Sequence, residues 1–430
     1  MRLTGVALFF LVSLFTMPLL AEREREMPVG VYLSWELANA YAELNGRPIT
    51  EFLDGSLELC RQKGVNTLWV TNIDPGDLPM VQELCHKRAI RLVANTCEGK
   101  ADSYYVDEAA PLRARLERMH AVATSTLDYW IISDEPEGRH VPNLAKYAGL
   151  LRQHDPGRGC ALVVTLHMID QIIGKVPLDM AAVDPYPFFG PDDPNGPHTA
   201  EASIAHFRRV GEHFVDVCRA AAVEPWMMPQ SFAEIWGGYR YGEDGMLFAQ
   251  PGSYLHWMTP TVEQIRWQVF ESLRQGAQGI VFFQLFPTML PAAGSQAMPD
   301  VPWKDVLLKK ETAAGFGALL TIYGKSTPQF DELGRLYPIL KRHSKLFREA
   351  RPAPTVPKWF SNLPETVRWA AFQMHGDGEV FVVLVNDDFE RPAMIGLSAE
   401  HLADLVTGRS QCTAIELPPG GGAILVQERR

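Results

Sequence analysis

The sequence has few cysteines, and none of them forms a C-x-x-C pair. Six are scattered over 430 residues, at Cys60, Cys85, Cys97, Cys160, Cys218 and Cys412. Structural zinc sites and dithiol redox centres use closely spaced cysteines, so this spacing indicates neither. We expect buried free thiols, with at most one disulfide bridge.

The sequence also lacks a cluster of basic residues. Its 40 Lys and Arg are outnumbered by 51 Asp and Glu, which gives a formal net charge of −11. Nucleic-acid binding depends on cations that neutralise phosphates, so we expect no nucleic-acid partner. An acidic surface is approached more easily by neutral or cationic molecules.

A long hydrophobic run occurs once, at the start of the sequence. Residues 1–21 read MRLTGVALFFLVSLFTMPLLA, and the polar stretch EREREMP follows directly. One basic residue, an apolar stretch and then a polar segment are typical of a secretory signal peptide. We therefore predict cleavage near Ala21, a secreted or periplasmic protein, and no stable membrane insertion after cleavage. An uncleaved anchor is the alternative, because the run is almost long enough to span a bilayer.

From Met27 onward, short apolar stretches alternate with segments of helical length. The apolar stretches are 28–36, 65–72, 90–98, 127–135, 160–167, 180–188, 224–232 and 279–287. Apolar strands separated by amphipathic helices predict a parallel sheet covered by helices, and eight such units are the number in a (β/α)8 or TIM barrel. A doubly wound sheet would carry a glycine-rich phosphate turn after strand one, where the sequence reads SWELANAYAELNG instead. We predict an α/β fold with the barrel at residues 28–325.

The pattern changes after the barrel. A helical segment at 326–350 leads into the proline-rich RPAPTVPKWF at 351–360. Beyond it, stretches such as GEVFVVLVNDD read as short strands separated by turn residues. This pattern predicts a small antiparallel β-sandwich at 351–430, joined to the barrel by the connecting helix.

Polar side chains gather at the predicted C-terminal ends of the barrel strands, where barrel enzymes carry their reactive groups. Carboxylates and amides dominate this set, which includes Glu36, Asp134, Glu135, His167, Asp184, Tyr186, Gln230, Glu234 and Gln284. No G-x-S-x-G elbow is present, so the sequence indicates no serine nucleophile. No histidine pair at metal-ligand spacing is present either, and we predict no metal and no cofactor. Such a set suits sugar hydrolysis, in which one acid protonates the leaving oxygen and amides hold hydroxyls.

The fourth strand, in DYWIISDEPEGRH at 128–140, ends on two acids. It resembles the Asn-Glu-Pro motif of retaining (β/α)8-barrel glycoside hydrolases, with Asp134, Glu135 and Pro136 in the three places. VDPYPF after strand six and GAQGIVFFQLF at strand eight are also similar to secreted bacterial carbohydrate enzymes. The resemblance implies that Glu135 is the general acid and that the partner is an oligo- or polysaccharide. We further expect Asp134 to raise the pKa of Glu135, and Pro136 to hold Glu135 extended.

Strand seven departs from the family pattern. The resemblance requires a nucleophilic Glu at its end, but PWMMPQSFAEIWGG places Gln230 there and Glu234 four residues later. A carboxamide cannot attack an anomeric carbon. Three interpretations stay open. Glu234 acts from the loop; the enzyme inverts or uses the substrate's own acetamido group, as hexosaminidase-like barrels with an Asp-Glu pair do; or the barrel binds polysaccharide without cleaving it.

Aromatic residues supply candidate sugar platforms. The loop after strand seven is rich in rings from Trp236 onward, which either stack on sugars or form the loop's own small core. For Trp35, Trp69 and His167 the alternative is a packing role in the barrel. The predicted catalytic residues are Glu135, Asp134 and Glu234. The predicted substrate-binding residues are Trp35, Glu36, Trp69, His167, Asp184, Tyr186, Gln230, Trp236 and Gln284.

Overall fold

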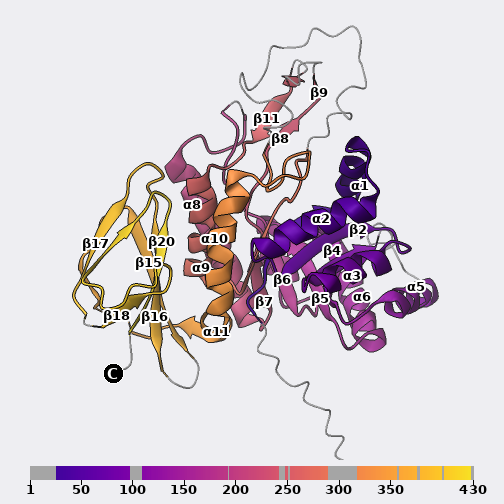
Figure 1. The fold of residues 1–430 in the computed structure, drawn as a ribbon. Helices are drawn as coiled ribbons and strands as arrows, with labels where there is room; N and C mark the ends of the chain where they lie inside the picture. Colours follow the sequence, from indigo (N-terminus) through magenta and orange to yellow (C-terminus); the bar gives the residue numbers. More distant parts are fainter. Residues whose placement is uncertain are drawn as a thin grey trace, which may run out of the picture.

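Eight parallel strands close into a barrel, with helices around it and a β-sandwich beside it (Figure 1). The structure is a computed structural model that describes residues 26–96, 109–191, 193–241, 247–249, 252–288, 317–355, 358–374, 378–399 and 401–427. The predicted signal peptide at 1–21 lies outside the described residues.

The barrel strands are neighbours in space in the order of the chain, and the last one pairs with the first, as in Gly30 with Val281. This closure confirms the predicted (β/α)8 barrel. Strand one ends at Ser34, because Trp35 already begins a helix. The strands are β1 (Val29–Ser34), β2 (Thr67–Ile73), β3 (Arg91–Thr96), β4 (Leu127–Asp134), β5 (Gly159–Val164), β6 (Met180–Val183), β7 (Glu224–Met227) and β12 (Gly279–Phe282).

Helices follow the strands and cover the outside of the barrel. In α9, Thr261 and Gln264 cap each other's backbone N–H groups, at 2.8 and 3.2 Å, and Gly276 ends the helix with a φ of 94°. The helices are α1 (Trp35–Leu44), α2 (Ile49–Gln62), α3 (Leu78–Lys87), α5 (Ala109–Val122), α6 (Val141–His154), α7 (Ile169–Ile172), α8 (Ala200–Ala220), α9 (Val262–Gln275), α10 (Pro328–Arg342) and α11 (Ser344–Glu349). Short 3-10 turns occupy Gly138–His140 and Leu166–Met168.

Side chains from alternate strand positions fill the lumen. Val31 and Leu33 of β1 pack outward under the helices, whereas Tyr32 points inward. Inside, Trp69 and Trp226 meet edge to face with their ring centroids 6.3 Å apart. The lumen is therefore a packed core, and ligands have access to the barrel at its ends.

The long connection after β7 folds into two small antiparallel sheets. The strand β8 (Glu234–Trp236) pairs with β11 (Tyr254–Trp257), and β9 (Tyr239–Tyr241) pairs with β10 (Leu247–Ala249). They stand above the barrel at the top of Figure 1. The predicted aromatic loop thus has secondary structure of its own.

The C-terminal part is the predicted β-sandwich. One sheet has the order β13-β15-β16-β20-β18 and the other the order β14-β17-β19. Val382 and Leu384 of β16 fill the space between the sheets, whereas Val383 and Val385 pack with the barrel helices. The strands are β13 (Ala350–Pro352), β14 (Phe360–Asn362), β15 (Val367–Met374), β16 (Val380–Asn386), β17 (Ala393–Leu397), β18 (Leu402–Asp404), β19 (Ala414–Leu417) and β20 (Gly422–Gln427).

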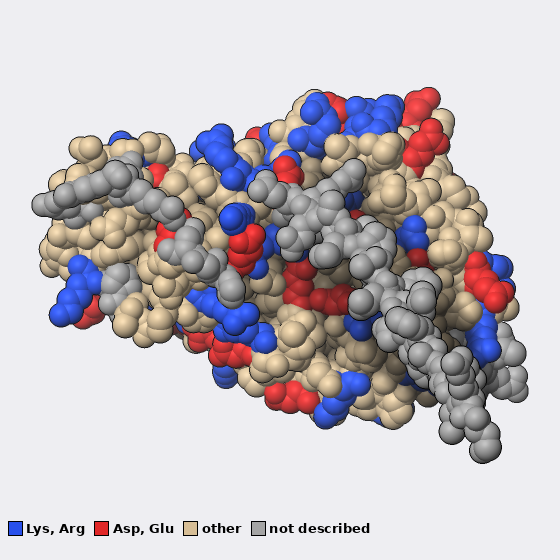
Figure 2. All heavy atoms as spheres, turned by 90° about the horizontal axis from the view of Figure 1, so that it is seen from below, with Lys and Arg blue, Asp and Glu red and all other residues tan. Residues whose placement is uncertain are grey.

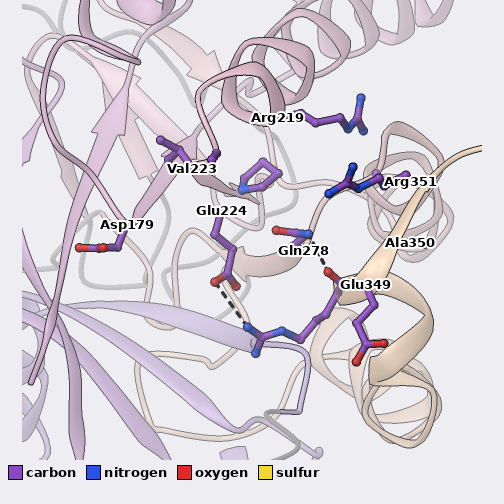
Figure 3. Close-up of a pocket in the computed structure, with 12 residues that line it drawn as sticks. Asp179, Arg219, Val223, Glu224, Gln278, Glu349, Ala350 and Arg351 are labelled. Carbon is purple, nitrogen blue, oxygen red and sulfur yellow. Dashed lines mark hydrogen bonds and ion pairs between the residues drawn. The ribbon is translucent and has the colours of Figure 1, made fainter. Parts of the chain in front are cut away.

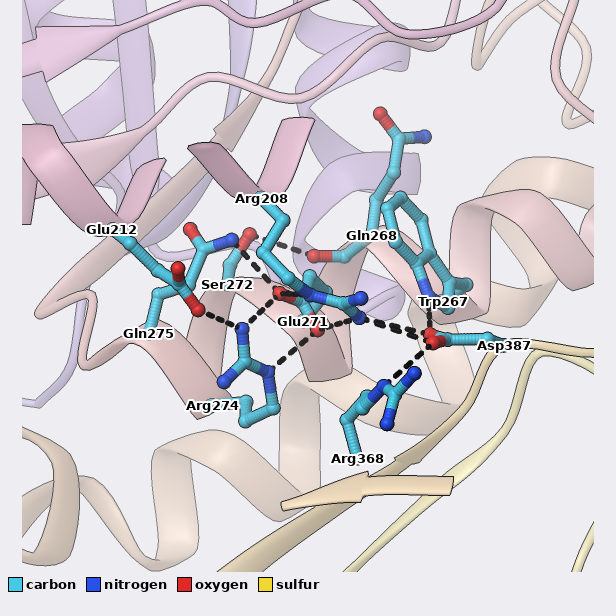
Figure 4. A network of polar contacts seen from close by, with 10 residues as sticks. All are labelled: Arg208, Glu212, Trp267, Gln268, Glu271, Ser272, Arg274, Gln275, Arg368 and Asp387. Carbon is cyan, nitrogen blue, oxygen red and sulfur yellow. Dashed lines mark hydrogen bonds and ion pairs between the residues drawn. The ribbon is translucent and has the colours of Figure 1, made fainter. Parts of the chain in front are cut away.

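A buried ionic network joins the sandwich to the barrel (Figure 4). Glu271 of α9 is fully buried and accepts hydrogen bonds from Arg208 at 3.0 Å and from Arg274 at 2.8 Å. Arg208 also donates to Asp387, which follows β16, at 3.0 Å. The indole N–H of Trp267 reaches the same Asp387 carboxylate at 3.0 Å. The two parts are therefore connected by apolar packing and by paired charges.

In the part of the chain that the structure describes, no helix is long and apolar enough to cross a membrane. Five cysteines lie in that part, and all are buried free thiols, as expected. Burial raises the pKa of the Cys85 thiol to about 12, which keeps it protonated.

Candidate functional site

Three carboxyl groups approach one another at the C-terminal mouth of the barrel. Asp134 ends β4, Glu135 follows it, and Asp184 follows β6. Met180 and Ala182 of β6 point into the lumen, so strand alternation brings Asp184 to the same inner side. The structure therefore brings together three of the predicted site residues from two separate strands, at the barrel end that carries the chemistry in such folds.

A β-bulge in β4 turns Asp134 toward the lumen. The pairing with β5 shifts between Ile131 and Ser133, so that Asp134 lies beside Val163, whose side chain is in the lumen. In a regular strand, Ser133 would share the inward face of Ile131 and Asp134 would face outward. Bulges re-aim side chains in this way, and here the bulge lets two consecutive acids serve one site.

Glu135 has a left-handed backbone, with a φ of 50°, and its N–H donates to the carbonyl of Val163 at 3.0 Å. The prediction that Pro136 holds Glu135 extended is therefore wrong. A proline disfavours the right-handed helical region for the residue before it, and the hydrogen bond to β5 fixes the left-handed alternative. For a residue other than glycine this conformation is strained, and such strain is concentrated at functional sites.

The carboxyl groups of Glu135 and Asp184 interact, because both the charge of Glu135 and hydrogen bonding with it contribute to the raised pKa of Asp184. Ionised carboxylates only accept hydrogen bonds, so a hydrogen bond between the two requires a proton on one of them. Burial raises the pKa of Asp184 well above its ordinary value, and the charges of Glu135 and Asp134 raise it further. The pair therefore keeps a proton at pH values where an isolated carboxyl group has lost it. Glu135 is the exposed member, and Asp184 is half-buried.

Two tyrosines border the carboxyl groups. Burial raises the pKa of Tyr32 and of Tyr186 well above the ordinary value, and the nearby charges of Asp134 and Asp184 add to the shift. The hydroxyl of Tyr32 shares a hydrogen bond of 2.8 Å with Thr71. Both phenols stay protonated and can donate to an oxygen at the site. Tyr186 was predicted, whereas Tyr32 was missed, although its alternation with the outward Val31 and Leu33 could have indicated it.

Gln230, at the end of strand seven, has a structural role. Its carboxamide is completely buried, accepts from the N–H of Phe188 at 2.9 Å, and donates to the carbonyls of Phe188, Phe232 and Met258 at 2.9–3.2 Å. These contacts occupy both ends of the carboxamide. The carboxamide of Gln230 therefore has no group left to hold a sugar, and its hydrogen bonds connect three loop segments.

Glu234 lies at the start of β8, and hydrogen bonding with the indole of Trp236 acts to lower its pKa. Burial raises the pKa of Glu234, and no neighbouring carboxyl group adds to this shift. The charges of the three carboxyl groups at the mouth, in contrast, contribute to the raised pKa of Asp184 or of the neighbouring Tyr32. Glu234 does not belong to that electrostatic cluster, so the structure gives no support to its predicted catalytic role.

The remaining predicted residues are spread over different environments. Trp69 is completely buried in the lumen, so the barrel-packing alternative describes it. Trp35 is also buried, and its indole donates to Asp77 at 3.3 Å. Glu36 is exposed in the first turn of α1, and His167 is exposed on a 3-10 turn after β5. None of these four residues takes part in the carboxyl cluster through a contact that the structure shows.

Gln284 follows β12 and stays near the mouth. Its side-chain oxygen accepts from the N–H of Ser34 at 3.4 Å, and its backbone carbonyl accepts from the hydroxyl of Ser231 at 2.9 Å. Gln284 thus links the ends of β1, β7 and β12, and its carboxamide stays among the proposed sugar-binding groups.

Two buried donors near this end of the barrel have no acceptor among the described residues. They are the side-chain amide of Asn95, which lies on β3, and the indole N–H of Trp257, whose ring is 5.4 Å from that of Tyr186. An unpaired buried donor destabilises a fold by about 1–3 kcal/mol. Such groups therefore call for a functional explanation, and a bound ligand or ordered water would satisfy them.

A cavity of about 800 Å³ lies at the opposite end of the barrel (Figure 3). Glu224, which begins β7, and Gln278, which precedes β12, line it together with residues of α11 and β13. Glu224 is already paired with Arg348 at 3.5 Å and accepts from the hydroxyl of Tyr129 at 3.2 Å. From below, this end of the protein shows mixed positive and negative charge (Figure 2). The cavity is thus separate from the carboxyl cluster.

Within the described ranges, no group of three His, Cys, Asp or Glu side chains is arranged to hold a metal ion. The polar groups at the mouth are carboxyl, phenol and carboxamide groups. Such an arrangement can donate and accept protons and can bind hydroxyl groups.

No family model matches the sequence, and no curated protein matches it. The structure is similar to that of a cold-adapted beta-galactosidase from Rahnella sp. R3, with a TM-score of 0.61 and 9% identity over 96% of this chain and 100% of that chain. It is also similar to a beta-galactosidase from Bacillus circulans sp. alkalophilus, with a TM-score of 0.59 and 8% identity over 94% of this chain and 99% of that chain. The identity is so low that the likeness concerns the fold alone. The protein thus resembles (β/α)8-barrel glycoside hydrolases in fold, as the strand-four motif implied.

Proposed function

We propose that the protein hydrolyses O-glycosidic bonds at the C-terminal mouth of the barrel, with Glu135 as the general acid. The observation that carries this proposal is the placement of Asp134, Glu135 and Asp184 together at the C-terminal ends of β4 and β6, where burial and the two neighbouring charges raise the pKa of Asp184. A glycosidase needs a carboxyl group that is still protonated at working pH, and like charges in a partly buried site provide one.

Proton transfer in this scheme uses the pair as a unit. Glu135 is exposed and faces the substrate, so it donates the proton to the leaving oxygen as the glycosidic bond breaks. The half-buried Asp184 holds or returns the proton through their hydrogen bond. Tyr186 and Gln284 supply hydrogen-bonding groups for sugar hydroxyls.

The anomeric carbon requires a second participant. Retaining enzymes place a nucleophilic carboxyl group about 5–5.5 Å from the acid, whereas in this proposal Asp184 serves the acid through its interaction with Glu135. Strand seven supplies the buried Gln230 in place of a nucleophile. This arrangement favours Asp134 as the second group, which either activates a water molecule or orients an acetamido group of the substrate itself. Hydrolysis of 2-acetamido sugars is therefore the second candidate activity.

The decisive variant is Glu135→Gln, which keeps the shape of the side chain and removes its acid. Glu137→Gln is the matched control, because Glu137 is exposed and paired with Arg139 at 2.9 Å. We expect a loss of about 10²–10⁴-fold in kcat on glycosides with poor leaving groups and a smaller loss on dinitrophenyl glycosides, whose leaving group needs no proton. The assay uses aryl glycosides of hexoses and of 2-acetamido hexoses together with polysaccharides.

Equal turnover by wild type and Glu135→Gln would overturn the assignment of Glu135. A wild-type protein that binds a polysaccharide but hydrolyses no member of the panel would instead identify a non-catalytic binding barrel.

We also propose that the protein is exported, to the periplasm or the medium. Support comes from the sequence alone, in the apolar run of residues 1–21 followed by EREREMP.

A further inference from the structure

We propose that Trp236 forms a distal sugar-binding subsite, so that the substrate of the proposed hydrolase is an oligosaccharide or polysaccharide chain rather than a single glycoside. This inference rests on the proposed function, because it specifies which substrates the carboxyl cluster receives. It is carried by the way in which the Trp236 side chain is held.

The Trp236 indole is stacked on another ring, and its side chain nevertheless stays partly exposed. The ring of His256 stacks on it with a centroid distance of 3.7 Å and an interplanar angle of 28°. The Trp236 residue is nevertheless 46% exposed, whereas His256 is 6% exposed. Among the described residues, Trp236 and Tyr323 are the large aromatic side chains that are exposed, so an indole that is backed by another ring and still half exposed requires an explanation. A sugar ring, whose apolar C–H face packs on aromatic rings, fits this surface.

The backing ring is itself fixed. The Nδ1 atom of His256 is hydrogen-bonded to the carboxylate of Asp193, which is buried. The other oxygen of Asp193 accepts from the N–H groups of Asn195 at 2.6 Å and Gly196 at 2.9 Å. These contacts anchor His256 to the turn after β6, so the indole rests on a support that does not rotate freely.

The edge of the indole is fixed as well. It lies near enough to the carboxyl group of Glu234, two residues earlier in β8, for hydrogen bonding between them to contribute to the pKa of Glu234. Trp257 of the partner strand β11 meets it edge to face, with the centroids 5.9 Å apart. Glu234 is therefore a positioning residue for Trp236. Preorganisation of this kind lowers the entropy that a platform loses when it binds a ligand.

The position of Trp236 relative to the carboxyl cluster determines how long a substrate must be to contact both. Tyr186 borders the cluster, its ring lies 5.4 Å from Trp257, and Trp257 lies 5.9 Å from Trp236. Trp236 is therefore not in direct ring contact with Tyr186 but is joined to it through Trp257, and a chain of several sugars can contact both the cluster and Trp236.

The test compares long and short substrates in Trp236→Ala. We measure kcat/KM for tetrasaccharides and for the aryl monoglycoside of the same sugar, using gluco-, galacto-, manno-, xylo- and 2-acetamido-gluco-configured series, and take the ratio of the two values. We expect wild type to prefer the tetrasaccharide and Trp236→Ala to lower the ratio about tenfold, which corresponds to the stacking of one aromatic ring. Glu234→Ala should lower it by a smaller factor, and Glu234→Gln, which keeps an acceptor for the indole, should restore most of it.

Met394→Ala is the matched control, because Met394 is 54% exposed on β17 of the sandwich. It should keep the wild-type ratio. The tetrasaccharides are also titrated against each protein with tryptophan fluorescence as the readout, so that the subsite is tested even where no hydrolysis occurs. Unchanged ratios and unchanged affinities in Trp236→Ala would overturn the subsite. An inactive wild type that loses tetrasaccharide affinity in Trp236→Ala would overturn the proposed hydrolysis and keep the subsite.

Discussion

At the scale of single residues, the main finding is that the partner of Glu135 comes from strand six. The sequence indicated Glu135 as an acid, and it indicated Asp184 only as a sugar-binding residue. Its interaction with Glu135, with Asp134 nearby, leads us to propose that Asp184 is part of the acid instead. Two residues 49 positions apart in the sequence meet because β4 and β6 end at the same mouth, and no local pattern reveals that contact.

Asp184→Asn tests this electrostatic arrangement through stability. The pKa of Asp184 is raised in the fold, so its stabilising contribution is present below its ordinary pKa of 3.8 and is lost as pH rises through the folded value. Asparagine carries no charge that could be repelled. We expect Asp184→Asn to raise the urea midpoint relative to wild type at pH 8 and to raise it less, or not at all, at pH 4.

The matched control is Asp216→Asn, whose carboxylate is 75% exposed and paired with Arg219 at 2.9 Å. Exposed pairs of this kind contribute about 0.2–1 kcal/mol, so this variant should not gain stability at pH 8. A destabilisation of Asp184→Asn that is equal at both pH values would contradict the shared proton.

At the scale of elements, the sequence predicted the strands well and the connections poorly. Apolar runs such as CALVVTLH marked a strand because burial on both faces leaves no polar position. The bulge in β4 could not be predicted, because one extra residue in a strand leaves the composition of the strand unchanged. The same holds for Gln230, whose partners come from the connections after β6, β7 and β11. A polar residue at a strand end reads as a ligand group when its partners are unknown.

Gln230→Ala tests whether the hydrogen bonds of the Gln230 side chain hold these connections together. The substitution leaves the N–H of Phe188 and three loop carbonyls without their partner. Each buried unpaired group costs about 1–3 kcal/mol, so we expect a loss of about 3 kcal/mol or more in the free energy of unfolding, measured by urea denaturation, together with a loss of activity.

Gln171→Ala serves as its control, since Gln171 is exposed and donates to the carbonyl of His167 at 3.2 Å. A surface change of this kind stays within about 0.5 kcal/mol. If both variants are equally stable, Gln230 does not hold the loops.

At the scale of the whole molecule, barrel and sandwich share one core. Composition and the change of periodicity predicted both parts, and the structure contains both. Their mutual contact was not predicted, because the charged residues that make it, Arg208, Glu271 and Asp387, lie far apart in the sequence and look like surface residues there. Charged side chains are rarely buried unless they are paired, and the pairing partners appear only in three dimensions.

Glu271→Gln tests the coupling of the two parts. Burial acts to raise the pKa of Glu271, but the hydrogen bonds and charges of Arg274 and Arg208 outweigh it, so the pKa is lowered. Its stabilising contribution is therefore present above the ordinary pKa of 4.5 and is lost as pH falls through the folded value. Breaking a buried pair costs about 3–5 kcal/mol. We expect that loss at pH 7, measured by urea unfolding, and a smaller difference from wild type in acid.

Glu212→Gln is the comparison, because Glu212 also pairs with Arg274, at 2.5 Å, but is 48% exposed. It should lose no more than about 1 kcal/mol. Equal losses in the two variants would show that burial of Glu271 does not matter for the interface.

The packing of α9 against β16 and β20 has a consequence for how the chain matures during synthesis. The ring of Phe270 on α9 lies against Gly422, at a distance too short for any side chain at that position. More than a hundred residues separate the two in the chain, so a ribosome releases α9 long before its cover exists. Until β20 has been synthesised, the apolar side chains of α9 that it covers are exposed, and during this interval the nascent chain is prone to aggregation.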